Sequence, residues 1–231
     1  MGALEGYSAE PSSRGCAGMI PACFEQLQTV LCLGAHADDI EIGCGGTLRK
    51  LIEQYPGLAV HWVVFSGDQA RAIEARQSAE VFLSDVTDRS FRGYEFRDSF
   101  FPSQAEAIKE AFHTLAAELS PDVIFTHRPD DAHQDHRVVS EMTGCTFRNH
   151  VVLEYEIPKY EGDLGQPNLL VQLSSAQVQR KVEHLMSAFP SQANKPWYTE
   201  DTYRAVMRLR GLECQSPSRY AEGFHARKLV M

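Results

Sequence analysis

The stretch that most constrains this chain is an apolar run, residues 30–35, which ends abruptly in the polar sequence His-Ala-Asp-Asp at 36–39. A glycine-rich segment, Gly-Cys-Gly-Gly at 43–46, begins after three intervening residues. An apolar run of strand length that stops at a histidine and two carboxylates is typical of a buried parallel strand that opens into a polar crevice. Ligands of open α/β sheets bind at this edge of the sheet. The stretch therefore predicts an interior strand with a site at its end.

A second predicted strand, 122–125, which is apolar from Val123 onward, also leads into polar residues. They include the sequence His-Gln-Asp-His at 133–136. Because the carboxyl ends of parallel strands meet at one edge of a sheet, we expect the two polar clusters to converge.

The rest of the pattern alternates between short apolar runs and amphipathic stretches. We expect strands at 30–35, 60–65, 90–96, 122–125, 151–157 and 169–173, and helices at 45–54, 70–83, 103–119, 138–147, 176–189 and 202–209. This order predicts an α/β fold, in which a Rossmann-like, mainly parallel sheet carries helices on both faces of a single domain.

Composition limits the number of domains, the cellular compartment and the classes of binding partner. With 231 residues, 43% of them hydrophobic, the chain is long enough for one domain, which we place at 23–231 after a loose leader at 1–22. The net charge of −9, without a Lys/Arg cluster, argues against nucleic acid as a partner. The six cysteines form no C-x-x-C pair, which favours a reducing cytoplasm. No apolar run reaches the roughly 18 residues of a membrane span, so we expect no transmembrane segment; a homo-oligomer is left open.

The residues of the two clusters are those of a catalytic zinc site. Such a site takes about three nitrogen or oxygen ligands from the protein and leaves one position for water. His36 and Asp39 can meet at one ion, and His136 would be the third ligand. Zinc lowers the pKa of its water to about 7, so a neighbouring carboxylate can take the proton. Asp38 is the expected general base.

His133 and Asp135 extend this chemistry. We expect Asp135 to hold a ring nitrogen of His133 and to favour the imidazolium, which could stabilise an oxyanion or protonate a leaving amine. The set suits metal-assisted hydrolysis of an amide. Asp135 also falls where a helix begins, so capping that helix is the alternative role.

The two motifs and the glycine run between them resemble the LmbE-like (PIG-L) family of zinc-dependent N-acetylglucosaminyl deacetylases. The family pattern is a strand, then His-Pro-Asp-Asp, then Gly-Cys-Gly-Gly, and later His-x-Asp-His. The resemblance implies a substrate that is an N-acyl amino sugar or its conjugate. The residues that it implies are the zinc ligands His36, Asp39 and His136, the base Asp38, the assisting pair His133 and Asp135, and Arg71 near the substrate.

Two positions depart from the family pattern. Ala37 replaces the usual proline, which should slacken the loop without removing a ligand. Asp131 stands where some members carry a tyrosine thought to aid proton transfer or oxyanion binding, so that role is unassigned in this chain.

Three hypotheses follow. The leading one is a zinc-dependent hydrolase that removes an N-acetyl or other N-acyl group. An acidic pair at a strand end can also hold magnesium for phosphoryl transfer, although histidine ligands disfavour that ion. The third is a metal-binding module without catalysis, in which the ion only ties two loops together.

Overall fold

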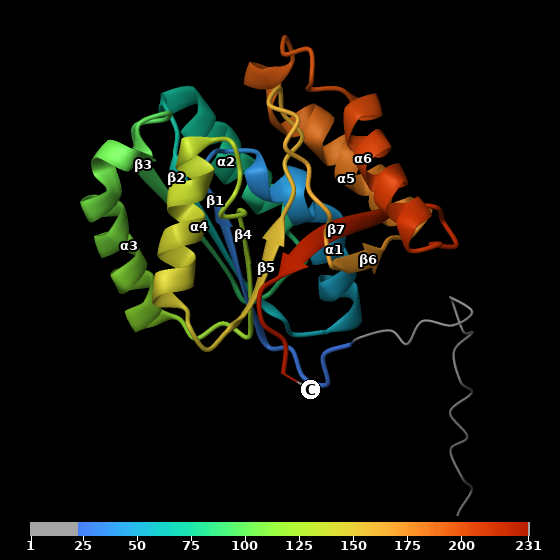
Figure 1. Cartoon of the computed structure of the whole chain (residues 1–231), viewed down its shortest axis with the longest axis horizontal. Helices are drawn as coiled ribbons and strands as arrows, with labels where there is room; N and C mark the ends of the chain where they lie inside the picture. The colour runs from blue at the N-terminus through green and yellow to red at the C-terminus, as the bar shows by residue number, and fades with distance from the viewer. Residues whose placement is uncertain (1–22, 231) are drawn as a thin grey trace, which may run out of the picture.

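Strand β1 (Thr29–Gly34) is an interior strand of the sheet around which the fold is built (Figure 1). The structure, a computed structural model, describes residues 23–230, so the leader expected at 1–22 lies outside the described residues. Within that part of the chain seven strands form one sheet in the order β3-β2-β1-β4-β5-β7-β6. β1 pairs in parallel with β2 (Ala59–Ser66) and β4 (Val123–Thr126).

The other elements complete this sheet and cover it. The remaining strands are β3 (Arg89–Phe96), β5 (Val151–Tyr155), β6 (Leu169–Gln172) and β7 (Ala221–Ala226). The helices are α1 (Asp39–Gln54), α2 (Gln69–Phe82), α3 (Ala105–Glu118), α4 (Gln134–Thr146), α5 (Ser175–Ala188) and α6 (Glu200–Glu213), with short 3-10 turns η1 (Phe101–Gln104) and η2 (Pro190–Gln192). Among the described residues, no helix combines the length and the apolar character that crossing a bilayer requires.

The sheet separates two hydrophobic cores. In β1, Val30 and Cys32 face the core beneath α1, α2, α5 and α6, whereas Leu31 and Leu33 face the core beneath α3 and α4. All four side chains are fully buried. A strand covered on both faces needs no polar alternation, which is why the run at 30–35 is continuously apolar. The predicted fold class, a mainly parallel sheet with helices on both faces, is confirmed.

Strand β7 is the element that the sequence pattern missed. It runs antiparallel between β5 and β6, and its sequence contains one large apolar residue, Phe224. Glu222 explains its polar character, because this buried carboxylate accepts the backbone N–H groups of Gly46 and Thr47 in α1. β7 therefore supports the helix that begins at the first polar cluster.

Gly43 places α1 against the sheet. A Cβ at this position would overlap the ring of Tyr155, whereas a Cβ at Gly45 would meet its neighbours at ordinary distances of 3.7 Å. We expect Gly43→Ala to lower the free energy of unfolding by about 1–3 kcal/mol through overpacking, although alanine favours a helix by about 1 kcal/mol. Gly45→Ala, the matched control, should be neutral or stabilising. Urea unfolding of both variants checks this, and equal stabilities would contradict it.

Candidate functional site

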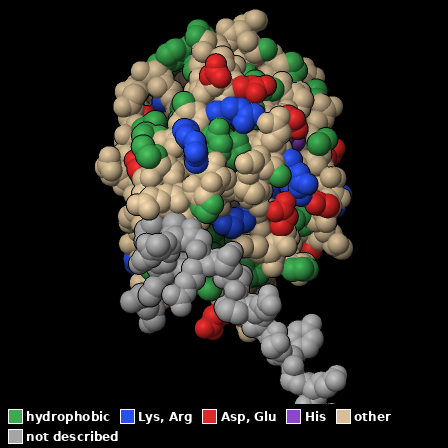
Figure 2. Space-filling view, turned by 90° about the vertical axis from the view of Figure 1, so that its right-hand side faces the viewer, with side chains coloured by type: hydrophobic (Ala, Val, Ile, Leu, Met, Phe, Trp, Pro, Cys, Tyr) green, Lys and Arg blue, Asp and Glu red, His purple; other side chains and the backbone are tan. Residues whose placement is uncertain are grey.

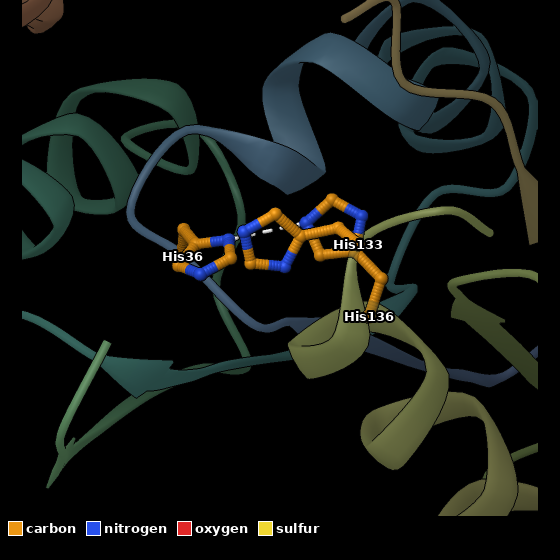
Figure 3. Close-up of side chains that lie close together, drawn as sticks. All are labelled: His36, His133 and His136. Atoms are coloured by element: carbon orange, nitrogen blue, oxygen red, sulfur yellow. Dashed lines mark hydrogen bonds between the residues drawn. The ribbon is translucent and has the colours of Figure 1, made fainter. Parts of the chain in front are cut away.

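The two polar clusters lie side by side at the carboxyl ends of β1 and β4. Figure 3 shows the rings of His36, His133 and His136 close together, with a contact between His36 and His136. The ring centroid of His36 lies 4.8 Å from that of His133 and 5.1 Å from that of His136. The structure thus brings together the histidines of both predicted clusters.

Both clusters occupy helix N-termini that begin earlier than the pattern predicts. α1 starts at Asp39 instead of 45, and α4 starts at Gln134 instead of 138. The first turn of α4 is polar throughout, and glycines interrupt the start of α1, so neither shows the apolar spacing of a helix. Carboxylates in these first turns interact favourably with the helix dipole.

Three predicted ligands have the spacing that one tetrahedral ion requires. His36 Nδ1 lies 3.1 Å from His136 Nε2 and 3.4 Å from the Asp39 carboxylate. His136 Nε2 lies 3.6 Å from Asp39 Oδ1, whereas His36 Nδ1 faces the other oxygen of that carboxylate, Oδ2. Ligand atoms bound at about 2.0–2.1 Å in a tetrahedron are about 3.3 Å apart. All three side chains are buried, and two imidazoles with one carboxylate are donors that suit zinc, so these residues fit a divalent cation.

Other donor atoms lie close enough to share an ion with these residues. The groupings are His36–His133–His136, Asp39–His127–His136 and His36–Asp98–Asp135. Neither His127 nor Asp98 is among the site residues predicted from the sequence. Each follows the end of a parallel strand, β4 or β3, and this position was the available signal.

His127 packs beneath the site. Its ring stacks on that of His136 with centroids 3.9 Å apart, and it is fully buried. Its Nε2 accepts the N–H of Ala35 at 3.0 Å and lies 3.1 Å from the Asp39 carboxylate. His127 therefore fixes the end of β1 next to the predicted ligands.

Asp135 differs from the expectation. Its carboxylate does not hold the ring of His133; it accepts the backbone N–H groups of Ser99 and Phe101 and lies 3.3 Å from His36 Nε2. These two amides fix the buried carboxylate beside His36. A carboxylate on the far nitrogen of a histidine orients the ring and directs its other nitrogen, Nδ1, toward an ion.

Asp38 lies beside the predicted ligands and forms an ion pair with Arg71. The Arg71 guanidinium contacts Asp38 Oδ1 at 2.9 Å and Asp98 at 3.2 Å. Among the described residues, Asp38 Oδ2 has no hydrogen-bond partner. Burial raises the pKa of Asp38 above its usual range, against the opposing effect of Arg71. Arg71, expected near the substrate, therefore holds the predicted base.

His133 also differs from the expectation. Burial, and then the nearby His36, lower the pKa of His133, so the ring is neutral near pH 7 instead of an imidazolium. Its Nδ1 accepts the backbone N–H of Asp135 at 3.3 Å, which places the ring proton on Nε2. The neutral ring is thus a hydrogen-bond donor through Nε2. Burial likewise lowers the pKa of His136 to about 3, so that ring is neutral too.

Comparison with known proteins gives matches in sequence and in structure. Residues 31–144 match the family model PIG-L, described as GlcNAc-PI de-N-acetylase. An uncharacterized deacetylase of Escherichia coli K12, YaiS, is 27% identical over 138 residues, which cover 56% of this chain and 74% of that protein.

Two solved structures show the same fold. The N,N'-diacetylchitobiose deacetylase of Pyrococcus horikoshii superposes with a TM-score of 0.67 at 23% identity, over 88% of this chain and 85% of that one. GalB of Pseudomonas putida KT2440, a 4-carboxy-2-hydroxymuconate hydratase, superposes with a TM-score of 0.71 at 17% identity, over 89% and 98%. This fold therefore carries more than one reaction, and the site residues must decide between them.

Proposed function

Because residues 31–144 of this chain match the model of the PIG-L (LmbE-like) deacetylase family, we propose that the protein is a zinc-dependent hydrolase that removes an N-acetyl or other N-acyl group from an amino sugar or its conjugate. The observation that carries the proposal is the mutual spacing of 3.1–3.6 Å among donor atoms of His36, Asp39 and His136. An amide of an amino sugar is the bond that the family description and the chitobiose deacetylase have in common.

His36, Asp39 and His136 would hold the metal. When bound, a divalent cation such as zinc polarises an acyl carbonyl and makes water a stronger nucleophile near neutral pH. The buried position of the three side chains excludes bulk water, which strengthens every electrostatic interaction in the site.

Asp38 is the general base in this proposal. Its free Oδ2 faces no protein donor among the described residues, so it can take the proton of an attacking water. Arg71 holds the other oxygen at 2.9 Å and keeps the carboxylate in one orientation. Base catalysis of this kind contributes about 10²- to 10⁴-fold to a rate.

His133 stabilises the oxyanion. Its Nε2–H is free to donate, because Nδ1 already accepts the N–H of Asp135. A neutral donor of fixed orientation stabilises the charge that develops on the acyl oxygen as water attacks.

We expect chelation to abolish activity. The purified protein should release free amine from N-acetylglucosamine or a conjugate, lose this activity on dialysis against dipicolinate, and regain it with one equivalent of zinc. Amine release is followed with fluorescamine, and bound metal by atomic absorption. Magnesium dependence without bound zinc would instead favour phosphoryl transfer, and bound zinc without release of amine from any N-acyl sugar would favour the non-catalytic module.

A further inference from the structure

Asp131 contacts three residues at the site, His133, His136 and Lys159. Its carboxylate, on the loop between β4 and α4, is buried. One oxygen, Oδ1, accepts the backbone N–H of His133 at 2.8 Å. The other oxygen, Oδ2, lies 3.1 Å from His136 Nδ1 and 3.0 Å from Lys159 Nζ.

These contacts decide where the proton of the His136 ring lies. His136 Nδ1 makes no well-aligned hydrogen bond within the described residues, but Asp131 Oδ2 lies within ion-pair distance of it. Because a carboxylate only accepts hydrogen bonds, it favours a proton on the ring nitrogen that it faces. Asp39 competes for the same proton from the other side of the ring, but at 3.6 Å from Nε2 it is the more distant carboxylate. Asp131 therefore selects the form with the proton on Nδ1, and the lone pair of Nε2 faces His36 and Asp39.

Lys159 fixes the carboxylate that makes this choice. Its ammonium group donates hydrogen bonds to Asp131 Oδ2 and to the carbonyl of Ile157 (3.1 Å), and it forms an ion pair with Asp163 (2.8 Å). Asp163 in turn accepts the N–H of Ala132 at 2.7 Å. The segment that follows β5 is thus tied to the loop that carries Asp131.

We propose that Asp131 is a positioning residue of the metal centre, which holds the proton of His136 on Nδ1 and leaves Nε2 free to bind the ion. The proposal rests on the proposed function, because it takes His136 as a ligand. Carboxylates in this position behind a metal-binding histidine typically contribute about 10- to 100-fold to metal affinity.

Asp131→Leu tests the proposal, because leucine removes the acceptor and leaves Asp39 as the nearest carboxylate to the ring. In the metal-free, ¹⁵N-histidine-labelled protein, long-range ¹H–¹⁵N spectra should show the proton on Nδ1 of His136 in the wild type and on Nε2 in Asp131→Leu. The affinity for Co²⁺, read from its visible absorption, should fall by about 10- to 100-fold. Asp131→Asn keeps an acceptor oxygen and should restore the Nδ1–H form.

Asp130→Leu is the matched control. It removes the neighbouring carboxylate of the same loop, which pairs with Arg128 and not with His136 or Lys159, so both readouts should stay as in the wild type. Thermal melting confirms that each variant is folded. An unchanged proton position, an unchanged Co²⁺ affinity, or an equal effect of Asp130→Leu would each overturn the proposal. Absence of Co²⁺ binding by the wild type would count against the proposed function alone, since the proton position is read in the metal-free protein.

Discussion

Asp38→Asn is expected to lower kcat by about 10²- to 10⁴-fold while the metal content of the purified protein stays unchanged. Asparagine keeps the shape of the side chain and an oxygen for Arg71, which contacts Asp38 at 2.9 Å. It cannot accept the proton of an attacking water. The loss should therefore appear in turnover and not in metal binding.

The pH dependence gives this prediction a second readout. A carboxylate acts as a base only when ionised, so wild-type activity should fall as the pH drops below the pKa of Asp38, which burial raises. This acidic limb should be absent from the residual activity of Asp38→Asn. Asp85→Asn, the same change at an exposed ion pair with Arg49, is the control and should leave kcat within about twofold. A metal-loaded Asp38→Asn variant with near wild-type kcat would remove Asp38 from the role of base.

The parts of the site that could be predicted from the sequence are those carried by strand ends. The strands predicted at 30–35 and 122–125 place His36 and His136 at one edge of the sheet, because parallel strands share their direction. That inference needs no knowledge of helices or loops. It accounts for the convergence of donors that are 100 residues apart.

What could not be predicted depends on contacts between distant segments. The amides of Ser99 and Phe101 bind the Asp135 carboxylate beside His36, and nothing in the local sequence indicates that loop. Strand β7 could not be predicted for the same reason. From the local sequence Glu222 looks like an exposed charge, but in the fold it contacts α1 and Lys181. The predicted starts of α1 and α4 are too late, because the first turns of these helices carry polar site residues and lack the apolar periodicity of a helix.

His136→Ala is expected to remove both the metal and the activity. It deletes one of three donors, and the remaining pair, His36 and Asp39, cannot hold an ion with comparable strength. Zinc affinity should fall by more than about 100-fold. This loss is larger than that expected when only a carboxylate that orients a metal-binding histidine is removed. Competition with a chromogenic chelator measures the affinity, and amine release measures the activity.

Two comparisons separate loss of a ligand from loss of structure. His113→Ala changes an exposed histidine of α3 and should leave zinc affinity and turnover as in the wild type. Imidazole added to His136→Ala should restore part of the zinc binding, because the deleted ring leaves a buried space of its own shape beside His127, which stacks on it at 3.9 Å. A His136→Ala variant that holds zinc at full occupancy would show that other donors, such as His36 with Asp98 and Asp135, bind the ion. The attacking water would then be bound elsewhere, and Asp38 could no longer be placed as its base. This variant therefore tests the ligand set and the role of Asp38 together.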